Sequence, residues 1–301
     1  MMDAKDLELL TYLSAHGRWD AEALSAQLGI SPGNVDRRIK LLVREGVILG
    51  FSAFFDRRIF GYDTTFLKLH FDQRHFDRVL NSISRMPQVA SVYPNMDDFM
   101  IVEVVHWDGA SLKAAVRAME RVASPFTVTD HFIPLLPEVL PDRPEGEALE
   151  LLSLLIRDGR SDVETLSENM GLPDDRVSDH LAYLFDRCGV IVKPVVQEDL
   201  INPFPTFSII LRMMKGCSFE SCYSEVRRIS KESWDSFPLQ RPKGIWLKCF
   251  GRDLYAMDTM LERFRRMKDV EDVMVILPDS VSMKRSVDLH IVSGSPEWGS
   301  S

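Results

Sequence analysis

Apolar residues in the first 45 positions recur at the three- and four-residue spacing of α-helices. They form three groups, which are Leu7, Leu10 and Leu13, then Ala23, Leu24 and Leu28, then Val35, Ile39 and Leu42. After Gly46 the pattern changes to the alternation that is typical of a strand, from Val47 to Phe55. Three short helices followed by a β-ribbon predict a winged helix-turn-helix over residues 1–61.

The breaks between these groups carry residues that end and begin helices. Gly17 interrupts the first helix, and Gly29 lies in the turn between the second and third. Ser31 and Pro32 then supply an N-cap and a proline at the first helical position. The third helix, which reads DNA in such domains, is therefore expected to begin beside Ser31.

Residues 62–136 follow a different plan, in which strands and helices alternate. The predicted order is strand, helix, strand, strand, helix, strand, which is typical of a ferredoxin-like domain. The elements are expected at Thr64–Phe71, Arg74–Met86, Val89–Tyr93, Phe99–Val105, Ala110–Val122 and Phe126–Ile133.

The whole plan is then repeated. Residues of the first helices recur identically 142 positions later, and the recurring residues are Glu8, Leu9, Leu10, Leu13, Gly17, Arg18, Leu24, Ser25 and Gly29. Such internal similarity indicates duplication. We predict an α+β chain of two repeats, each a winged helix-turn-helix followed by a βαββαβ domain. The second copy takes residues 147–203 and 204–292, after a Pro- and Glu-rich linker at 137–146, and a disordered tail follows at 293–301.

Composition limits the classes of protein to consider. The chain has 301 residues, 45% of them hydrophobic, and a net charge of −9, which excludes a disordered chain and a uniformly basic nucleic-acid coat protein. The four cysteines, among them Cys217 and Cys222, have no neighbouring histidine and are expected to be reduced, mostly buried thiols. No metal site or cofactor fingerprint is found. Without a basic leader or a long apolar run, the chain is expected to be cytoplasmic.

Three segments resemble the leucine-responsive regulator/AsnC (Lrp/AsnC) family. They are the helix end Leu42–Ile48, the domain entry Phe60-Gly61-Tyr62, and the strand Asp98–Val102. The resemblance covers nearly the whole chain and implies a transcription regulator whose N-terminal domain binds double-stranded DNA. It also implies that the βαββαβ sheets pair and bind a small effector, often an amino acid. Because two units are fused here, one chain is expected to fold as a pseudo-dimer.

The two copies differ in charge. Residues 31–45 carry a net +2, whereas the equivalent residues 173–187 carry a net −2. Over the whole helical domains the net charges are 0 for residues 1–60 and −8 for residues 145–203. Since phosphates are repelled by an acidic surface, we expect only the first copy to bind DNA. The expected contacts are Ser31, Asn34, Arg37, Arg38, Lys40 and Arg44 on the third helix, with Arg57 and Arg58 after the wing.

An effector site is expected at the turn before Asp98. Asp97 and Asp98 would hold the ammonium group of an amino-acid-like effector, and Asn95 stands where the family carries glycine. Two chains with twofold symmetry would present two basic helices to a palindromic site, so a homodimer is expected.

Two alternatives remain open beside this regulator, which is expected not to be an enzyme. One is a siroheme-decarboxylase-like enzyme, because Gly61–Thr65 and Leu277–Lys284 faintly resemble sequences of that family, although Ser91–Asn95 stands where its His- and Arg-rich segment is expected. The other is an interaction scaffold that does not bind DNA.

Overall fold

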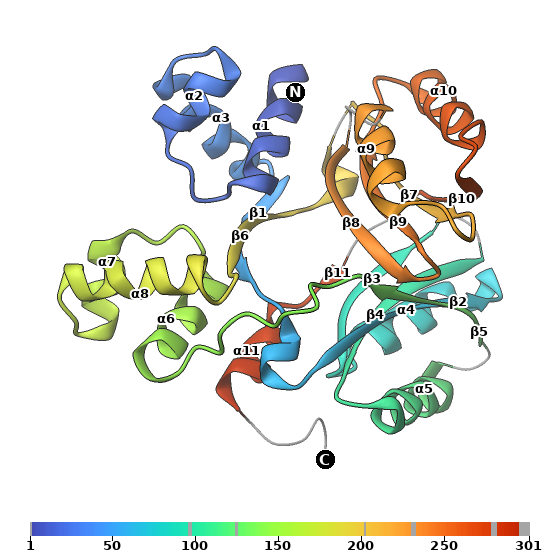
Figure 1. Cartoon of the computed structure of the whole chain (residues 1–301), viewed down its shortest axis with the longest axis horizontal. Helices are drawn as coiled ribbons and strands as arrows, with labels where there is room; N and C mark the ends of the chain where they lie inside the picture. Colours follow the sequence, from blue (N-terminus) through green and yellow to red (C-terminus); the bar gives the residue numbers. More distant parts are fainter. Residues whose placement is uncertain are drawn as a thin grey trace. The chain divides into compact units, whose positions relative to one another are not determined.

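The computed structural model describes residues 2–95, 98–123, 126–201, 203–229, 233–277 and 282–294. The chain divides into two compact units, and each unit collects the equivalent domains of both repeats. The winged helices of residues 4–63 and 137–197 form one unit together with the C-terminal segment from residue 283, and the βαββαβ domains of residues 64–136 and 198–282 form the other. The predicted α+β architecture with two repeats is confirmed (Figure 1).

The winged-helix unit contains two three-helix domains of the same design. The first consists of α1 (Ala4–Ala15), α2 (Ala21–Leu28), α3 (Pro32–Arg44), β1 (Ile48–Phe54) and η1 (Arg57–Phe60). The second consists of α6 (Gly146–Arg157), α7 (Val163–Met170), α8 (Asp174–Asp186) and β6 (Ile191–Val196). Capping is repeated as well: Asp20 and Asp162 cap α2 and α7, which both end at a left-handed glycine, Gly29 or Gly171.

The two winged helices are joined by the antiparallel strands β1 and β6. Their register places Phe51 opposite Pro194. Because residues 46–48 correspond in sequence to residues 189–191, an offset of 143, Phe51 and Pro194 are equivalent positions of the two copies. The ladder is therefore centred on a pseudo-twofold axis, and within this unit one chain has the arrangement of a dimer.

Two glycines that recur in the sequence allow this close approach. The Gly17 N–H donates to the Val192 carbonyl at 3.2 Å, and the Gly159 N–H donates to the Phe51 carbonyl at 2.9 Å. A Cβ atom on Gly17 would lie 2.3 Å from the Val192 carbonyl oxygen, so the backbone of β6 leaves no room for a side chain there. The repeated glycines are thus required by the contact between the copies.

The arginines that follow these glycines cross the pseudo-twofold axis reciprocally. Arg18 Nη1 donates to the Gly159 carbonyl at 2.7 Å, and Arg160 Nη2 donates to the Trp19 carbonyl at 2.8 Å. Burial lowers the pKa of both guanidinium groups. The repeated Gly-Arg pair therefore serves the interface between the copies.

A C-terminal helix, α11 (Arg285–Ser293), belongs to the winged-helix unit. It packs against α6 through buried residues that include Val287 and Ile291. Arg57 Nε pairs with Asp288 at 2.7 Å. The second βαββαβ domain was predicted to span residues 204–292. The chain leaves the sheet unit after residue 282, so the predicted range is too long at its C-terminal end. Most of the predicted tail, residues 295–301, lies outside the described residues.

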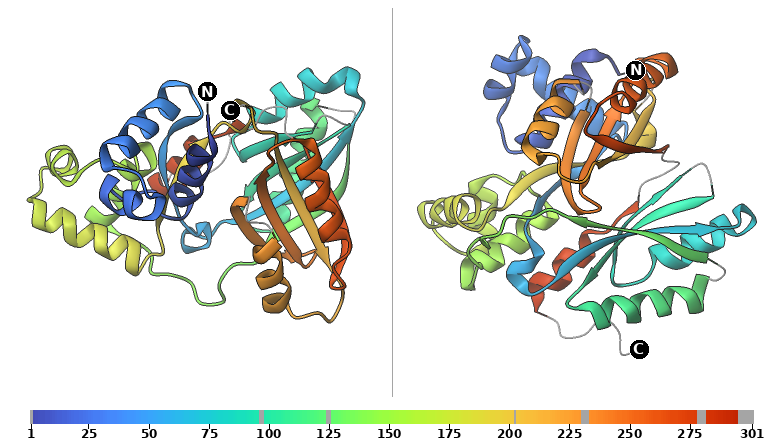
Figure 2. Two further views of the ribbon diagram at one scale, coloured as in Figure 1. Left: turned by 90° about the horizontal axis from the view of Figure 1, so that it is seen from above. Right: turned by 45° about the vertical axis from the view of Figure 1, so that its right-hand side comes forward.

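The other unit is built on one continuous sheet in the order β10-β7-β9-β8-β5-β2-β4-β3, which ends at β11 where the chain leaves this unit. The first copy supplies β2 (Asp63–Phe71), η2 (Gln73–His75), α4 (Phe76–Ser84), β3 (Val89–Pro94), β4 (Phe99–His106), α5 (Gly109–Ala123) and β5 (Phe126–Pro134). The second supplies η3 (Glu198–Leu200), β7 (Thr206–Met213), α9 (Phe219–Ile229), β8 (Ser233–Arg241), β9 (Gly244–Phe250), α10 (Leu254–Arg265), β10 (Val270–Ile276) and β11 (Ser282–Met283). In each copy the two helices cover one face of the strands (Figure 2).

Side chains on the helix-free strand faces of the two copies meet in an aromatic cluster. Phe66 and Tyr93 of the first copy lie 5.1 and 5.2 Å, between ring centroids, from Trp246 of the second. Beside this cluster Lys248 Nζ pairs with Glu198 Oε1 at 2.9 Å, and both side chains are nearly buried. Aromatic rings and a nearly buried ion pair therefore lie between these faces.

Candidate nucleic-acid interface

Helix α3 presents one buried and one exposed face. Val35 and Leu42 are fully buried against the domain, while Arg37, Lys40 and Arg44 are exposed. Pro32 occupies the first turn, where its missing N–H costs nothing. Ser31 is the exposed N-cap, and its side chain makes no capping hydrogen bond. Three of the basic positions predicted from the sequence are thus displayed along the outside of one helix.

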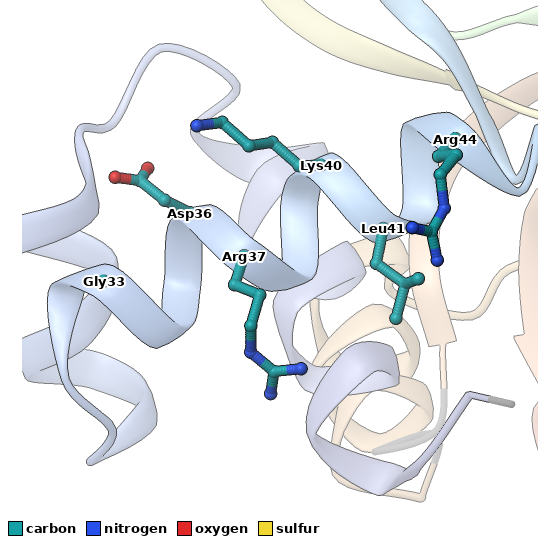
Figure 3. Close-up of a pocket in the computed structure, with 6 residues that line it drawn as sticks. All are labelled: Gly33, Asp36, Arg37, Lys40, Leu41 and Arg44. Carbon is teal, nitrogen blue, oxygen red and sulfur yellow. The ribbon is translucent and has the colours of Figure 1, made fainter.

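These residues surround a groove of about 680 Å³ on the α3 surface (Figure 3). Arg37, Leu41 and Arg44 point to one side of the helix, and Asp36 and Lys40 point to the other. The complete lining is Gly33, Asp36, Arg37, Lys40, Leu41 and Arg44. Gly33, Asp36 and Leu41 were not predicted from the sequence. Each lies four positions from Arg37 or Lys40, and this helical spacing places it on the same surface.

The start of α3 carries a small polar cluster. Asn34 Oδ1 accepts a hydrogen bond from Arg37 Nη2 at 3.0 Å, which restrains the guanidinium near the first turn. Anions also favour this end of a helix, because the peptide dipoles leave partial positive charge there. The predicted contacts Ser31, Asn34 and Arg37 therefore lie together at the N-terminal end of α3.

Arg38 differs from its neighbours because it points into the domain. Its Nη1 atom lies 2.6 Å from Asp6 Oδ1 on α1, and the side chains of the two residues are only 15% and 3% exposed. Such a nearly buried pair ties α3 to α1. The structure thus gives Arg38 a role in the fold of the domain, where the sequence reasoning had expected a contact to DNA.

The two predicted arginines after the wing are also engaged within the chain. Arg57 pairs with Asp288 of α11. Arg58 Nη2 pairs with Asp56 at 2.6 Å and donates to the Pro137 carbonyl at 2.7 Å. This hydrogen-bonded carboxylate raises the pKa of Arg58. Both arginines therefore stabilise the segment after β1 through contacts within the chain. Neither belongs to the exposed face of α3.

The second copy carries the same helix with the opposite charge. At the offset of 142, the exposed cations Arg37, Lys40 and Arg44 are replaced by Asp179, Ala182 and Asp186. The first turn of α8 adds Asp174 and Asp175. A pair between the third and first helices is present in both copies. In the second copy His180, the counterpart of Arg38, lies 2.9 Å from Glu147 of α6. The contact between the first and third helices is therefore retained in the second copy, while the charge on the exposed face of the third helix is reversed.

The predicted effector residues are only partly brought together. Asn95 is buried, and its Oδ1 accepts a hydrogen bond from the Leu277 N–H at 2.7 Å. Asp98 is exposed, with Oδ1 3.3 Å from His70 Nδ1. Asp97 lies outside the described residues. The Asn95 amide is therefore used by the fold, and of the two described effector residues Asp98 is the accessible one.

Within the part of the chain that the structure describes, no three or more His, Cys, Asp and Glu side chains gather as metal ligands would. No described helix has both the length and the apolar character needed to cross a membrane.

Comparisons with known proteins identify the first domain. A family model described as a winged helix-turn-helix DNA-binding domain matches residues 2–48. The HTH-type transcriptional regulator Ptr1 of Methanocaldococcus jannaschii is 27% identical over 100 residues, which cover 33% of this chain and 68% of that protein. The 100 residues that match Ptr1 are more than the family model covers.

Other comparisons concern an enzyme. The siroheme decarboxylase of Hydrogenobacter thermophilus is 28% identical over 76 residues, which cover 25% of this chain and 23% of that protein. The crystal structure of the siroheme decarboxylase NirDL matches with a TM-score of 0.56 at 16% identity, covering 92% of this chain and 91% of that one. The expectation that the chain is not an enzyme is contradicted, because an enzyme has this fold over nearly its whole length.

Proposed function

We propose that this chain, a tandem-duplicated protein of the Lrp/AsnC type, binds double-stranded DNA through the exposed face of α3 and regulates transcription. The observation that carries the proposal is the reversal of charge between equivalent helices. Arg37, Lys40 and Arg44 line a groove on α3, and acidic residues or alanine replace them on α8. Because DNA affinity rests on neutralised phosphates, α3 is suited to bind the duplex and α8 is not.

The geometry of α3 supports docking in a major groove. The first turn offers Ser31 and Asn34 to base edges or phosphates, and the cations along the helix suit guanine edges and the two flanking backbones. Arg38, Arg57 and Arg58 make intramolecular ion pairs, so the proposed contact set is narrower than the sequence suggested. The remaining set is Ser31, Asn34, Arg37, Lys40 and Arg44.

The test is the salt dependence of binding of the full chain to a random-sequence duplex, followed by fluorescence anisotropy. Each phosphate contact contributes a slope of about −0.9 in a plot of log affinity against log salt. Arg37→Ala and Arg44→Ala should therefore each reduce the magnitude of the slope by about one. Arg176→Ala on α8 is the matched control and should leave the slope unchanged. Equal losses in all three variants, or none in the α3 variants, would overturn the proposal.

Two finer parts of the proposal concern partners. Two chains related by a twofold axis would present two α3 helices to a palindromic site, and native mass measurement with and without such a duplex tests this dimer. A small effector with an ammonium group would be held by Asp98, beside His70. Asp98→Asn should then abolish the change in DNA affinity that an effector causes.

A second candidate function is tetrapyrrole chemistry of the siroheme-decarboxylase type. The match of NirDL over 92% of the chain favours it. Titration of the full chain with siroheme or haem tests it, since a bound tetrapyrrole changes its absorbance spectrum. A spectral change that saturates would support this function, and an unchanged spectrum would remove it. The DNA measurement is independent, so either function is tested without the other.

A further inference from the structure

A pocket of about 390 Å³ lies at the start of α10, outside every residue discussed so far as a DNA or effector contact. Its floor is apolar and is formed by Ile229, Phe250 and Met260. Phe250 stacks on Trp234 with ring centroids 6.0 Å apart and planes at 11°, so the floor is held in place. A pocket of this size falls at the lower end of the range of about 300–1,000 Å³ for sites of small ligands.

Two arginines line this pocket, Arg252 before α10 and Arg263 two turns along it. Both side chains are exposed, and neither forms an ion pair with any residue that the structure describes. Two acids close to them in sequence make other contacts: Asp253 caps the Ala256 N–H, and Glu262 pairs with Arg265 and Arg266. The pocket is therefore rimmed by two guanidinium groups whose charge the described part of the protein does not neutralise.

Tyr255 adds an aromatic ring to the same rim. Its side chain is 81% exposed at the first turn of α10, although tyrosine usually buries part of its ring. The lining residues that the structure describes are Ile229, Phe250, Gly251, Arg252, Tyr255, Ala256, Thr259, Met260 and Arg263, and none of these carries a carboxylate. The combination of apolar floor, exposed ring and two cations is complementary to a ligand that is both hydrophobic and anionic.

The first copy of the domain lacks this combination. Asp108 caps the Ser111 N–H as Asp253 caps the Ala256 N–H, which aligns α5 with α10 at an offset of 145. At that offset Trp107 stands in place of Arg252, and Ala118 in place of Arg263. The fold of the domain therefore does not require these arginines.

We propose that this pocket binds a small hydrophobic carboxylate, such as an aromatic 2-oxo acid, and discriminates against the corresponding amino acid. Arg252 and Arg263 would hold the carboxylate, since the planar guanidinium matches it with paired hydrogen bonds. The hydrocarbon part would cover Phe250 and Met260. An ammonium group finds no carboxylate among the described lining residues and is repelled by both arginines, which disfavours the amino acid.

The experiment is isothermal titration of the full chain with phenylpyruvate and with L-phenylalanine. We expect phenylpyruvate to bind with a Kd of about 1 mM or tighter and phenylalanine to bind at least about tenfold more weakly. Arg252→Gln and Arg263→Gln should each weaken phenylpyruvate binding about tenfold or more. Arg265→Gln is the matched control, because Arg265 lies on the same helix, outside the pocket, and should leave binding unchanged.

Three results would overturn the proposal. These are no heat of binding for phenylpyruvate, equal affinity for phenylalanine, or an equal loss in Arg263→Gln and Arg265→Gln. Circular dichroism of each variant checks that it is folded, and both arginines are exposed, so their loss is not expected to unfold the domain. None of these measurements requires DNA, so their outcome is separate from that of the proposed function.

Discussion

The contact between the two winged helices can be tested at a single backbone position, Gly17. A Cβ atom there would lie 2.3 Å from the Val192 carbonyl oxygen and 2.7 Å from its carbon. Since both atoms belong to the backbone of β6, the strand itself must move to admit Gly17→Ala. Overpacking of this kind costs about 1–3 kcal/mol. Loss of the 3.2 Å hydrogen bond from Gly17 to Val192 adds about 1 kcal/mol.

Gly17→Ala is therefore expected to lower the free energy of unfolding of the winged-helix unit by about 2–4 kcal/mol. For a unit of this size that corresponds to a decrease in Tm of about 5–12 °C. Differential scanning calorimetry of the full chain measures it, and the transition of the winged-helix unit is recognised because it is the one that the substitution shifts.

Two matched variants make the test sharper. At Gly159 a Cβ would meet the Val192 Cγ1 atom at 2.7 Å, and the nearest backbone atoms, those of Ser52, lie at 3.2 Å. A side chain adjusts more easily than a backbone, so Gly159→Ala should cost less than Gly17→Ala. Gly33 on α3 has open space around it, so Gly33→Ala should leave Tm unchanged or raise it slightly. A Tm of Gly17→Ala equal to that of Gly33→Ala would refute the close contact of β6 with Gly17.

Three further results are expected. Asp6→Asn removes the negative charge that pairs with the Arg38 guanidinium, so it should lower the free energy of unfolding by about 2–3 kcal/mol in calorimetry, and an unchanged Tm would contradict a structural role of this pair. Glu198→Gln should cost about 3 kcal/mol because it leaves the buried charge of Lys248 unpaired, and the double variant Glu198→Leu/Lys248→Met should recover most of the loss. Burial raises the pKa of Cys222 to about 11. Its thiolate is therefore scarce at pH 8 and increases as pH rises towards that value, so mass spectrometry should find little alkylation by iodoacetamide at pH 8, and rapid alkylation would contradict the buried thiol.

Much of the fold was predictable because the sequence contains two copies of the same order of elements. The periodicity of residues 1–61 and 62–136 predicted the order of helices and strands, and the identities at an offset of 142 supported the helices of the first domain. What the repeat could not reveal is the role of Gly17 and Arg18, since a glycine and an arginine at a helix end are also compatible with a simple turn. Their function depends on contacts with β6 and with Gly159, which are far away in the sequence.

The orientation of Arg38 could have been predicted from helical spacing, which the net charge of residues 31–45 does not take into account. Arg38 follows Val35 by three positions and precedes Leu42 by four, which places it on the buried face of α3. Arg37 and Arg44 do not share that spacing and are exposed. The helical spacing therefore distinguishes the inward Arg38 from the exposed Arg37 and Arg44, whereas all three contribute equally to the net charge of residues 31–45.

The C-terminal helix α11 was not predictable from the repeat. It follows the second βαββαβ domain, and the first copy has only the linker at the equivalent point. Its apolar residues Val287, Ile291 and Val292 have helical spacing, but their partner surface belongs to α6, more than 100 residues earlier. Only the folded chain shows that Arg57, expected as a DNA contact, faces Asp288 there.

A common rule connects the proposed DNA site and the proposed carboxylate site. The glycines Gly17 and Gly159, which are identical in the two copies, are used to join the copies. Arg37 against Asp179 on the winged helices and Arg263 against Ala118 on the sheet domains differ, and they lie where the fold requires no particular side chain. Since neither arginine is needed for its domain to fold, each can be removed without disturbing the frame. Ligand binding, rather than stability, is therefore the property that these substitutions should change.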